Sequence, residues 1–100
     1  MSLARYTWLP VGLPALTVEF FPVGDECWEV RTLDGEPLGT ILRVSVTISR
    51  RKRFTVVKPW HWRFLNSDQN RGSHLRSRDE ACSALLFQVK GSTARKADHA

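Results

Sequence analysis

Apolar and polar residues alternate along several stretches of the chain, with the period of two that half-buried strands show. Leu16, Val18 and Phe20, for example, alternate with polar residues. The same alternation returns in Cys27–Leu33, Leu38–Ile48 and Trp60–Leu65, and Phe54–Lys58 is rich in residues that favour strands. These segments predict an antiparallel sheet of four or five strands.

Turn-forming residues separate the predicted strands. Pro22–Asp25 follows the first strand, and Asp34-Gly35 is the strongest hairpin signal, because glycine readily adopts the positive φ of tight hairpins. Pro59 has no backbone donor and therefore marks an edge, a bulge or a junction. Asn66–Gly72 is a polar run that predicts a loop.

The two ends of the chain lack regular patterns. Pro10, Gly12 and Pro14 disfavour a continuous strand or helix near the start. We therefore expect residues 1–15 to form an irregular N-terminal arm, with Trp8 and Leu9 as its anchors. Residues 92–100 have no apolar periodicity, and we expect them to form a flexible C-terminal tail.

A helix is predicted before that tail, where the apolar spacing changes. Ser77 and Glu80 match a capping box, in which the Ser77 hydroxyl accepts from the Glu80 N–H and the Glu80 carboxylate reaches back. Lys90 and Gly91 are typical of a helix end, a cation followed by a glycine cap. One apolar stripe, with Ala81 beside it, is spaced i, i+3, i+4 and i+7: Cys82, Leu85, Leu86 and Val89.

Together these elements predict one α+β domain over residues 1–91, an antiparallel sheet of four or five strands with one C-terminal helix packed on one face. A length of 100 residues and a hydrophobic content of 42% fit a single modest core. No apolar run has the length of a membrane span, the N-terminus is a poor signal peptide, and two cysteines make no disulfide scaffold. We expect a cytoplasmic protein, or a nuclear one in a eukaryote.

Charge is unevenly distributed along the chain, whose net charge is +5. Residues 1–42 carry two cations and six carboxylates, a net of −4, whereas residues 43–100 carry thirteen cations and four carboxylates, a net of +9. This split predicts one strongly positive surface region that attracts polyanions such as nucleic acid. The alternative is that the basic residues only keep a small domain soluble.

The first candidate contact is a run of four adjacent cations. Like charges repel, so the run favours an exposed turn between strands, from which it can reach phosphates. A solvated hairpin tip without a ligand is the alternative. The four residues are Arg50, Arg51, Lys52 and Arg53.

The second candidate, Lys58–Arg63, interleaves basic and aromatic residues, as nucleic-acid-binding strands do. Trp60 and Trp62 fall on one face. We expect the helix to cover that face and the tryptophans to be core, the alternative being that they stack on bases. The opposite, outward face then carries the polar candidates Arg43, Ser45, Thr47, Thr55, His61 and Arg63.

A third group of cations lies in the polar loop and at the helix start, where free N–H groups attract anions. It comprises Arg71, Arg76 and Arg78, beside His74. The favoured alternative is a solvated loop in which these cations are incidental.

Metal and catalytic sites are disfavoured. Cys27, His61, His74 and Cys82 lack the local spacing of zinc ligands. The sequence also has no nucleophile elbow, phosphate-cradling glycine loop or carboxylate pair. We therefore expect no cofactor and no enzymatic activity.

The stretch 53–86 is predicted to form two strands, a polar turn and a helix. The helix opens with a hydroxyl cap, two acidic residues and alanine, and its motif is the Glu80-Ala81 helix start. In this the stretch resembles the small AP2-type sheet-plus-helix modules, relatives of which occur in plant transcription factors and phage-type integrases. The resemblance covers about a third of the chain, and the acidic N-terminal half has no counterpart in it. It implies that the sheet enters the major groove of DNA, with contacts from Arg43, Arg63 and the Arg50–Arg53 turn.

The predicted function is non-enzymatic nucleic-acid binding, with DNA favoured over RNA, through the outer sheet face and the basic turn. The alternative is a protein–protein interaction module, such as a small phage or mobile-element protein that binds a host protein. In that case the acidic segment Asp25–Glu36 would be as important as the basic half.

Overall fold

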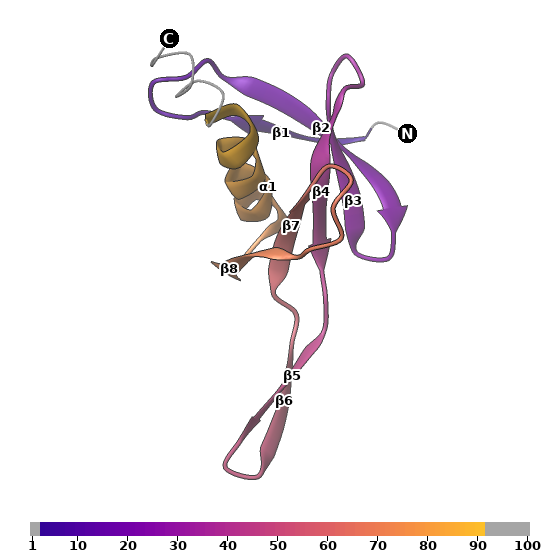
Figure 1. Cartoon of the computed structure of the whole chain (residues 1–100), viewed down its shortest axis with the longest axis vertical. Helices are drawn as coiled ribbons and strands as arrows, with labels where there is room; N and C mark the ends of the chain where they lie inside the picture. The colour runs from indigo at the N-terminus through magenta and orange to yellow at the C-terminus, as the bar shows by residue number, and fades with distance from the viewer. Residues whose placement is uncertain (1–2, 92–100) are drawn as a thin grey trace.

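Six strands pair in one antiparallel sheet and place most of their buried apolar residues on a common face. The structure is a computed structural model that describes residues 3–91 (Figure 1). The strands lie in the order β1-β2-β3-β4-β7-β8. Their bounds are Ala4–Trp8 (β1), Leu16–Gly24 (β2), Cys27–Thr32 (β3), Pro37–Arg43 (β4), Trp60–Phe64 (β7) and Arg71–Leu75 (β8).

A separate two-stranded ribbon lies between β4 and β7 in the chain. Its strands, β5 (Val46–Arg50) and β6 (Arg53–Val57), pair with each other in an antiparallel ladder. The ribbon points away from the sheet and the helix, at the lower end of Figure 1. The molecule therefore measures 54 × 38 × 24 Å, and its radius of gyration is 15.3 Å, above the value of about 13 Å for a compact domain of this length.

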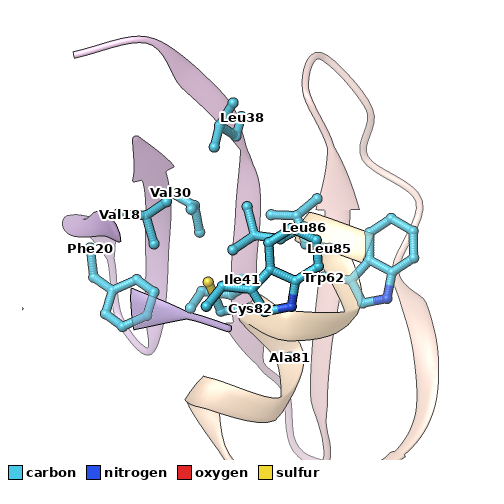
Figure 2. Packing of buried hydrophobic residues seen from close by; sticks show 11 residues of the cluster. Val18, Phe20, Val30, Leu38, Ile41, Trp62, Ala81, Cys82, Leu85 and Leu86 are labelled. Carbon is cyan, nitrogen blue, oxygen red and sulfur yellow. The ribbon is translucent and has the colours of Figure 1, made fainter. Parts of the chain in front are cut away.

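The helix α1 (Arg78–Leu86) covers one face of the six-stranded sheet, as predicted, and contacts β1, β4, β7 and β8. Figure 2 shows its buried side chains against those of the sheet. The helix contributes Ala81, Cys82, Leu85 and Leu86, and the sheet contributes chiefly Val18, Phe20, Val30, Ile41 and Trp62. The predicted apolar stripe is thus the contact between helix and sheet.

The helix begins at the predicted cap. Ser77 is the N-cap, and its hydroxyl oxygen accepts a hydrogen bond from the Glu80 N–H at 3.1 Å. The Glu80 carboxylate reaches back, but it accepts from the N–H of Arg76 at 3.1 Å rather than from that of the cap residue. The Ser77 hydroxyl therefore satisfies a backbone donor of the first turn, and the Glu80 carboxylate satisfies the donor that precedes the cap.

The end of the helix differs from the prediction. After Leu86 the chain continues in a π-helical turn, η1 (Phe87–Gly91). Gly91 closes this turn without the positive φ of a glycine cap. Neither helical segment in residues 3–91 has the length and apolar character that a bilayer crossing would need. The predicted tail, residues 92–100, lies outside the described residues.

The prediction of four or five strands is too low, because the described residues form six strands in the sheet and two in the ribbon. Residues 4–8, expected in an irregular arm, form β1, and the Trp8 side chain is buried in the core. Pro10 and Gly12 lie in the following loop and interrupt only that loop. Arg71 and Gly72, expected in a polar loop, open β8.

The predicted strand Leu38–Ile48 is two strands. β4 ends at Arg43 and β5 begins at Val46. On the returning chain, Lys58 and Pro59 lie between β6 and β7, and proline has no N–H to donate to a ladder. Pro59 therefore marks a junction, and beyond it the chain forms the ribbon instead of extending the sheet.

Candidate nucleic-acid interface

The four predicted cations stand at the tip of the β5–β6 ribbon. Arg50 pairs with Arg53 as the last residues of the ladder, so Arg51 and Lys52 are the two central residues of the turn. Both have positive φ, 47° and 65°. Two central residues with positive φ are the mark of the type I′ turn, whose twist matches that of the flanking strands.

Arg51 and Lys52 are unfavourable residues for this turn. Asn-Gly and similar pairs are preferred there, because a side chain crowds the following carbonyl when φ is positive, at about 1–2 kcal/mol for each residue. The β3–β4 turn of the same chain has Gly35 at its positive-φ position, with φ 91°. The ribbon tip thus carries two cations where turn geometry favours small residues.

The positive charge of the tip is exposed and not neutralised. All four cations are exposed, and within residues 3–91 none of them takes part in an ion pair. Residues 43–67 contain seven cations and no Asp or Glu. The tip therefore combines a concentrated positive field with side chains that are free to reach an anion.

The ribbon also exposes apolar side chains on both faces. Paired residues share a face, so Ile48 lies on the face of Arg50 and Arg53, whereas Phe54 lies on the other face with Val56. Phe54 is 77% exposed and Val56 63%. The sequence pattern does not predict this surface, because it places the apolar side of each alternating strand in the core. The available signal was that one short helix cannot cover every apolar strand face.

Arg43 and Lys58 hold the base of the ribbon. The Arg43 Nη1 lies 3.8 Å from Oε1 of Glu26, and the Lys58 Nζ lies 3.6 Å from Oε2 of the same carboxylate. The Arg43 Nε also donates to the backbone oxygen of Lys58 at 2.9 Å, and the guanidinium lies 5.6 Å from the centre of the Trp60 ring. These two cations are therefore engaged in contacts within the chain.

The predicted outward face of Arg43, His61 and Arg63 is wrong for Arg43. The β4–β7 register pairs Arg43 with Trp60, which places it on the face of Trp60 and Trp62. His61 and Arg63 do share the opposite face. Ser45 lies between β4 and β5, and Thr47 and Thr55 belong to the ribbon, so the six predicted residues form no continuous surface of one sheet.

His61 and Arg63 have neighbours within the chain. The Arg63 Nε donates to Oδ1 of Asn70 at 2.7 Å. His61 is half-buried opposite Leu42, and its Nδ1 atom is buried without a hydrogen-bond partner among the described residues. Leu42 itself is buried although it lies on the outer face. This part of the outer face is therefore partly covered.

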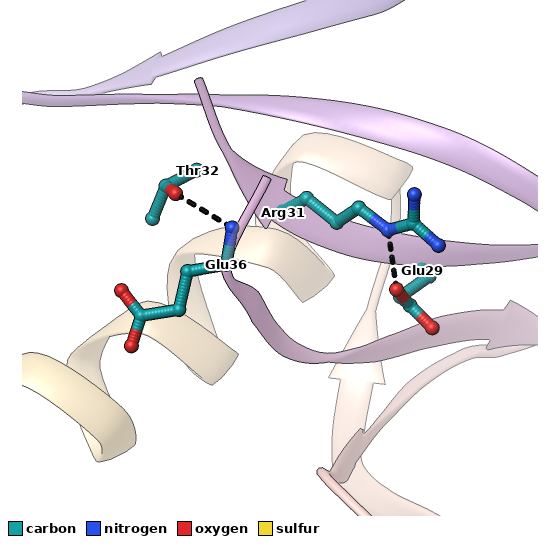
Figure 3. A network of polar contacts seen from close by, with 4 residues as sticks. All are labelled: Glu29, Arg31, Thr32 and Glu36. Carbon is teal, nitrogen blue, oxygen red and sulfur yellow. Dashed lines mark hydrogen bonds and ion pairs between the residues drawn. The ribbon is translucent and has the colours of Figure 1, made fainter. Parts of the chain in front are cut away.

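The rest of the outer sheet face is balanced in charge. Glu29 accepts a hydrogen bond from the Nε of Arg31 (Figure 3). The Arg31 guanidinium also lies 4.0 Å from the centre of the Phe21 ring. At the edge, Arg5 lies 3.9 Å from Glu19. Since each of these arginines faces a carboxylate, the strongest positive field belongs to the ribbon tip.

The third predicted group does not act as one set, because two of its cations pack on aromatic rings and the third is exposed. The Arg71 guanidinium lies 5.0 Å from the Phe64 ring centre, and the Arg78 guanidinium lies 4.6 Å from that of Phe20. Arg78 therefore covers a ring of the core, and Arg71 covers a ring packed against the core. Arg76 is exposed just before the helix. The carboxylate of Glu80 already occupies the helix start, so these residues form no open anion site there.

The tryptophans behave as core residues. Trp62 is only 6% exposed. Trp60 is half-buried, and its ring stacks on that of Trp28 with 5.6 Å between centres. Neither ring presents an open platform for bases, which favours the core interpretation of the sequence.

The cysteines are not described as part of a group of metal-binding side chains. Among the side chains that the structure describes, which do not include that of His74, no three His, Cys, Asp or Glu residues are grouped to hold a metal ion. Cys82 is buried in the core, and burial raises the pKa of its thiol from 9.0 to about 12. This thiol therefore stays protonated and unreactive at neutral pH.

No protein-family model, curated protein or solved structure matches the chain.

Proposed function

We propose that the protein is a non-enzymatic nucleic-acid-binding protein, with DNA favoured over RNA, and that the β5–β6 ribbon is its binding element. The observation that supports this most is the placement of Arg51 and Lys52 in a type I′ turn that disfavours them. Conformational strain of this kind concentrates at functional sites. Here the strain presents positive charge at the end of a projecting ribbon.

A projecting two-stranded ribbon is a known type of DNA-binding element. Two-stranded β-ribbons bind DNA in either groove: the major groove, about 12 Å wide, admits one, and other β-ribbon proteins use the minor groove. Arg50 and Arg53 flank the turn and can contact phosphates on either side of it. The proposal keeps the expectation, drawn from the AP2-type resemblance, that strands rather than a helix enter the groove, but it assigns this role to the ribbon.

A turn-preserving variant tests the proposal. Arg51→Asn with Lys52→Gly removes two charges and installs the preferred residues of the type I′ turn. Each phosphate contact releases counterions, so we expect weaker binding to every DNA sequence and a salt slope reduced by about 2. The measurement is fluorescence anisotropy with labelled duplex DNA, single-stranded DNA and RNA between about 50 and 200 mM salt.

A matched control removes two charges from the body of the protein. Arg5→Gln with Arg76→Gln changes the net charge equally but leaves the ribbon intact. We expect this variant to keep the affinity of the wild type at matched salt within a small factor. Equal weakening of binding by both variants would show that the ribbon contributes only through the net charge. No binding to any nucleic acid at low salt would refute the proposal.

The protein–protein alternative has one observation in its favour. Exposed apolar side chains on the ribbon, Phe54 and Val56 above all, are also typical of protein interfaces. The acidic segment favours it less, because Glu26 and Glu29 already pair with basic residues of the same chain. Capture of a protein partner by the wild type, but not by Val56→Ser, from nuclease-treated lysate would support this alternative.

A further inference from the structure

Phe54 differs from other aromatic residues beside cations in this chain. It is 77% exposed, although it directly follows Arg53 and lies one residue pair from the tip. Arg31 covers the ring of Phe21 at 4.0 Å, and Arg71 covers that of Phe64 at 5.0 Å. Within residues 3–91, no ring or cation–π contact involves Phe54.

The ladder leaves the Phe54 ring open to a ligand. Its partner across the ribbon is Ser49, whose short side chain covers little of a phenyl ring. Val56 and Thr47 are the next pair on the same face. The ring is therefore the largest side chain of this face and stands beside the cationic turn. A ligand that removed this exposed apolar surface from water would gain free energy from its burial.

We propose that Phe54 is an apolar wedge that inserts between adjacent base pairs of duplex DNA while the tip cations hold the neighbouring phosphates. Proteins that bind DNA in the minor groove and kink it insert apolar side chains, phenylalanine among them, at a base step. The charge around the ring favours DNA over a second copy of this protein as the ligand. Two ribbons packed tip to tip would bring eight cations together, whereas DNA brings phosphates to them. This inference rests on the proposed function and goes beyond it by naming the duplex, the base step and the inserting residue.

Phe54→Ala tests the wedge with a duplex that carries the fluorescent base 2-aminopurine, whose emission rises when its stacking is lost. With wild-type protein at saturation we expect a clear rise in emission. Phe54→Ala should weaken duplex binding by about 5- to 150-fold, the range for loss of one aromatic–base contact. At saturating protein the emission rise should be absent. Phe54→Leu should keep part of the rise, since aliphatic wedges also separate bases.

Leu9→Ala is the matched control. Leu9 is 76% exposed, as much as Phe54, but it lies in the loop after β1 and away from the ribbon. We expect this variant to bind and to unstack the duplex as the wild type does. Circular dichroism of all variants checks that each one is folded.

The outcomes separate the wedge from the proposed function. An unchanged emission rise with saturating Phe54→Ala would overturn the wedge while nucleic-acid binding stands. An equal loss of affinity for single-stranded DNA and duplex would also overturn it, in favour of stacking on single strands. A wild-type dimer that Phe54→Ala dissociates in sedimentation would assign the ring to a second copy instead. No binding of DNA by the wild type would refute the proposed function itself.

Discussion

Leu85 of α1 packs directly on Gly39 of β4. A Cβ atom on residue 39 would lie 2.7 Å from Cδ1 of Leu85 and 2.6 Å from the backbone oxygen of Arg63. Both distances are shorter than van der Waals contact allows. The absence of a side chain at residue 39 is therefore what lets the helix approach the sheet this closely.

Gly39→Ala should destabilise the domain by about 1–3 kcal/mol, the usual effect of overpacking a core. Leu85→Ala should destabilise it by about 2–5 kcal/mol, because it leaves a cavity between helix and sheet. Urea unfolding followed by tryptophan fluorescence measures both. The double variant should lose less stability than the sum, since removing Leu85 relieves one of the two clashes. Strict additivity would contradict this contact.

Ser77→Ala should cost about 1 kcal/mol of stability through loss of the helix cap. The hydroxyl satisfies the Glu80 N–H, and alanine has no acceptor to replace it. Ser77→Asp restores an acceptor and should recover most of the loss. The same urea titration measures both variants, and equal stability of the alanine variant and the wild type would show that the cap is not needed.

Arg51→Asn with Lys52→Gly should stabilise the ribbon at the same time as it weakens binding. Both substitutions relieve residues with positive φ, each worth about 1–2 kcal/mol. The ribbon has its own ladder and can open without unfolding the core, so the gain is expected in local opening rather than in global unfolding. Amide hydrogen exchange of β5 and β6 should slow by about tenfold or more. Faster exchange would indicate that the native turn is not strained.

Stability should fall with rising pH above the ordinary pKa of a thiol. Burial raises the pKa of Cys82 from 9.0 to about 12, so the unfolded chain loses this proton first. The contribution of the protonated thiol to the free energy of unfolding is complete below about pH 9 and is lost toward pH 12. The slope of this loss is up to about 1.4 kcal/mol per pH unit. Burial also raises the pKa of Tyr6 above 10.0, which adds a loss of the same sign at higher pH.

Cys82→Ala separates this effect from general alkaline unfolding. The variant is less stable throughout because of its cavity, but its stability should change less between about pH 8 and pH 10. Urea midpoints at the two pH values measure the difference. An equal change in the wild type and the variant would assign the pH dependence to other groups.

The structural features that could be predicted from the sequence are those that depend on local signals. The Ser77 cap, the apolar stripe of α1 and the Asp34-Gly35 hairpin depend on residues within one or two turns of chain. The Gly35 N–H donates to the oxygen of Thr32 at 3.0 Å, as a tight hairpin requires. The core position of Trp62 was also predictable, because its apolar face matched the stripe on the helix.

Non-local geometry decided the rest. The alternation of Leu42 with Arg43 continues smoothly through Ser45 to Ile48, so nothing in the pattern marks the departure of the ribbon from the sheet. The register of β4 against β7 determines the face on which Arg43 lies. A shift of one residue in that register would move every side chain of the strand to the opposite face. The exposure of Phe54 followed from the same departure.

The position of the ribbon makes it an exchangeable part of the protein. Arg43 and Trp60 are already partners in the sheet, so residues 44–59 begin and end at adjacent points and contribute little to the buried core. A short turn in their place would join β4 to β7 directly and leave the helix-covered sheet intact. The sheet is in this sense a frame that accepts hairpins of other lengths and compositions, and the tip sequence can be varied with little effect on folding.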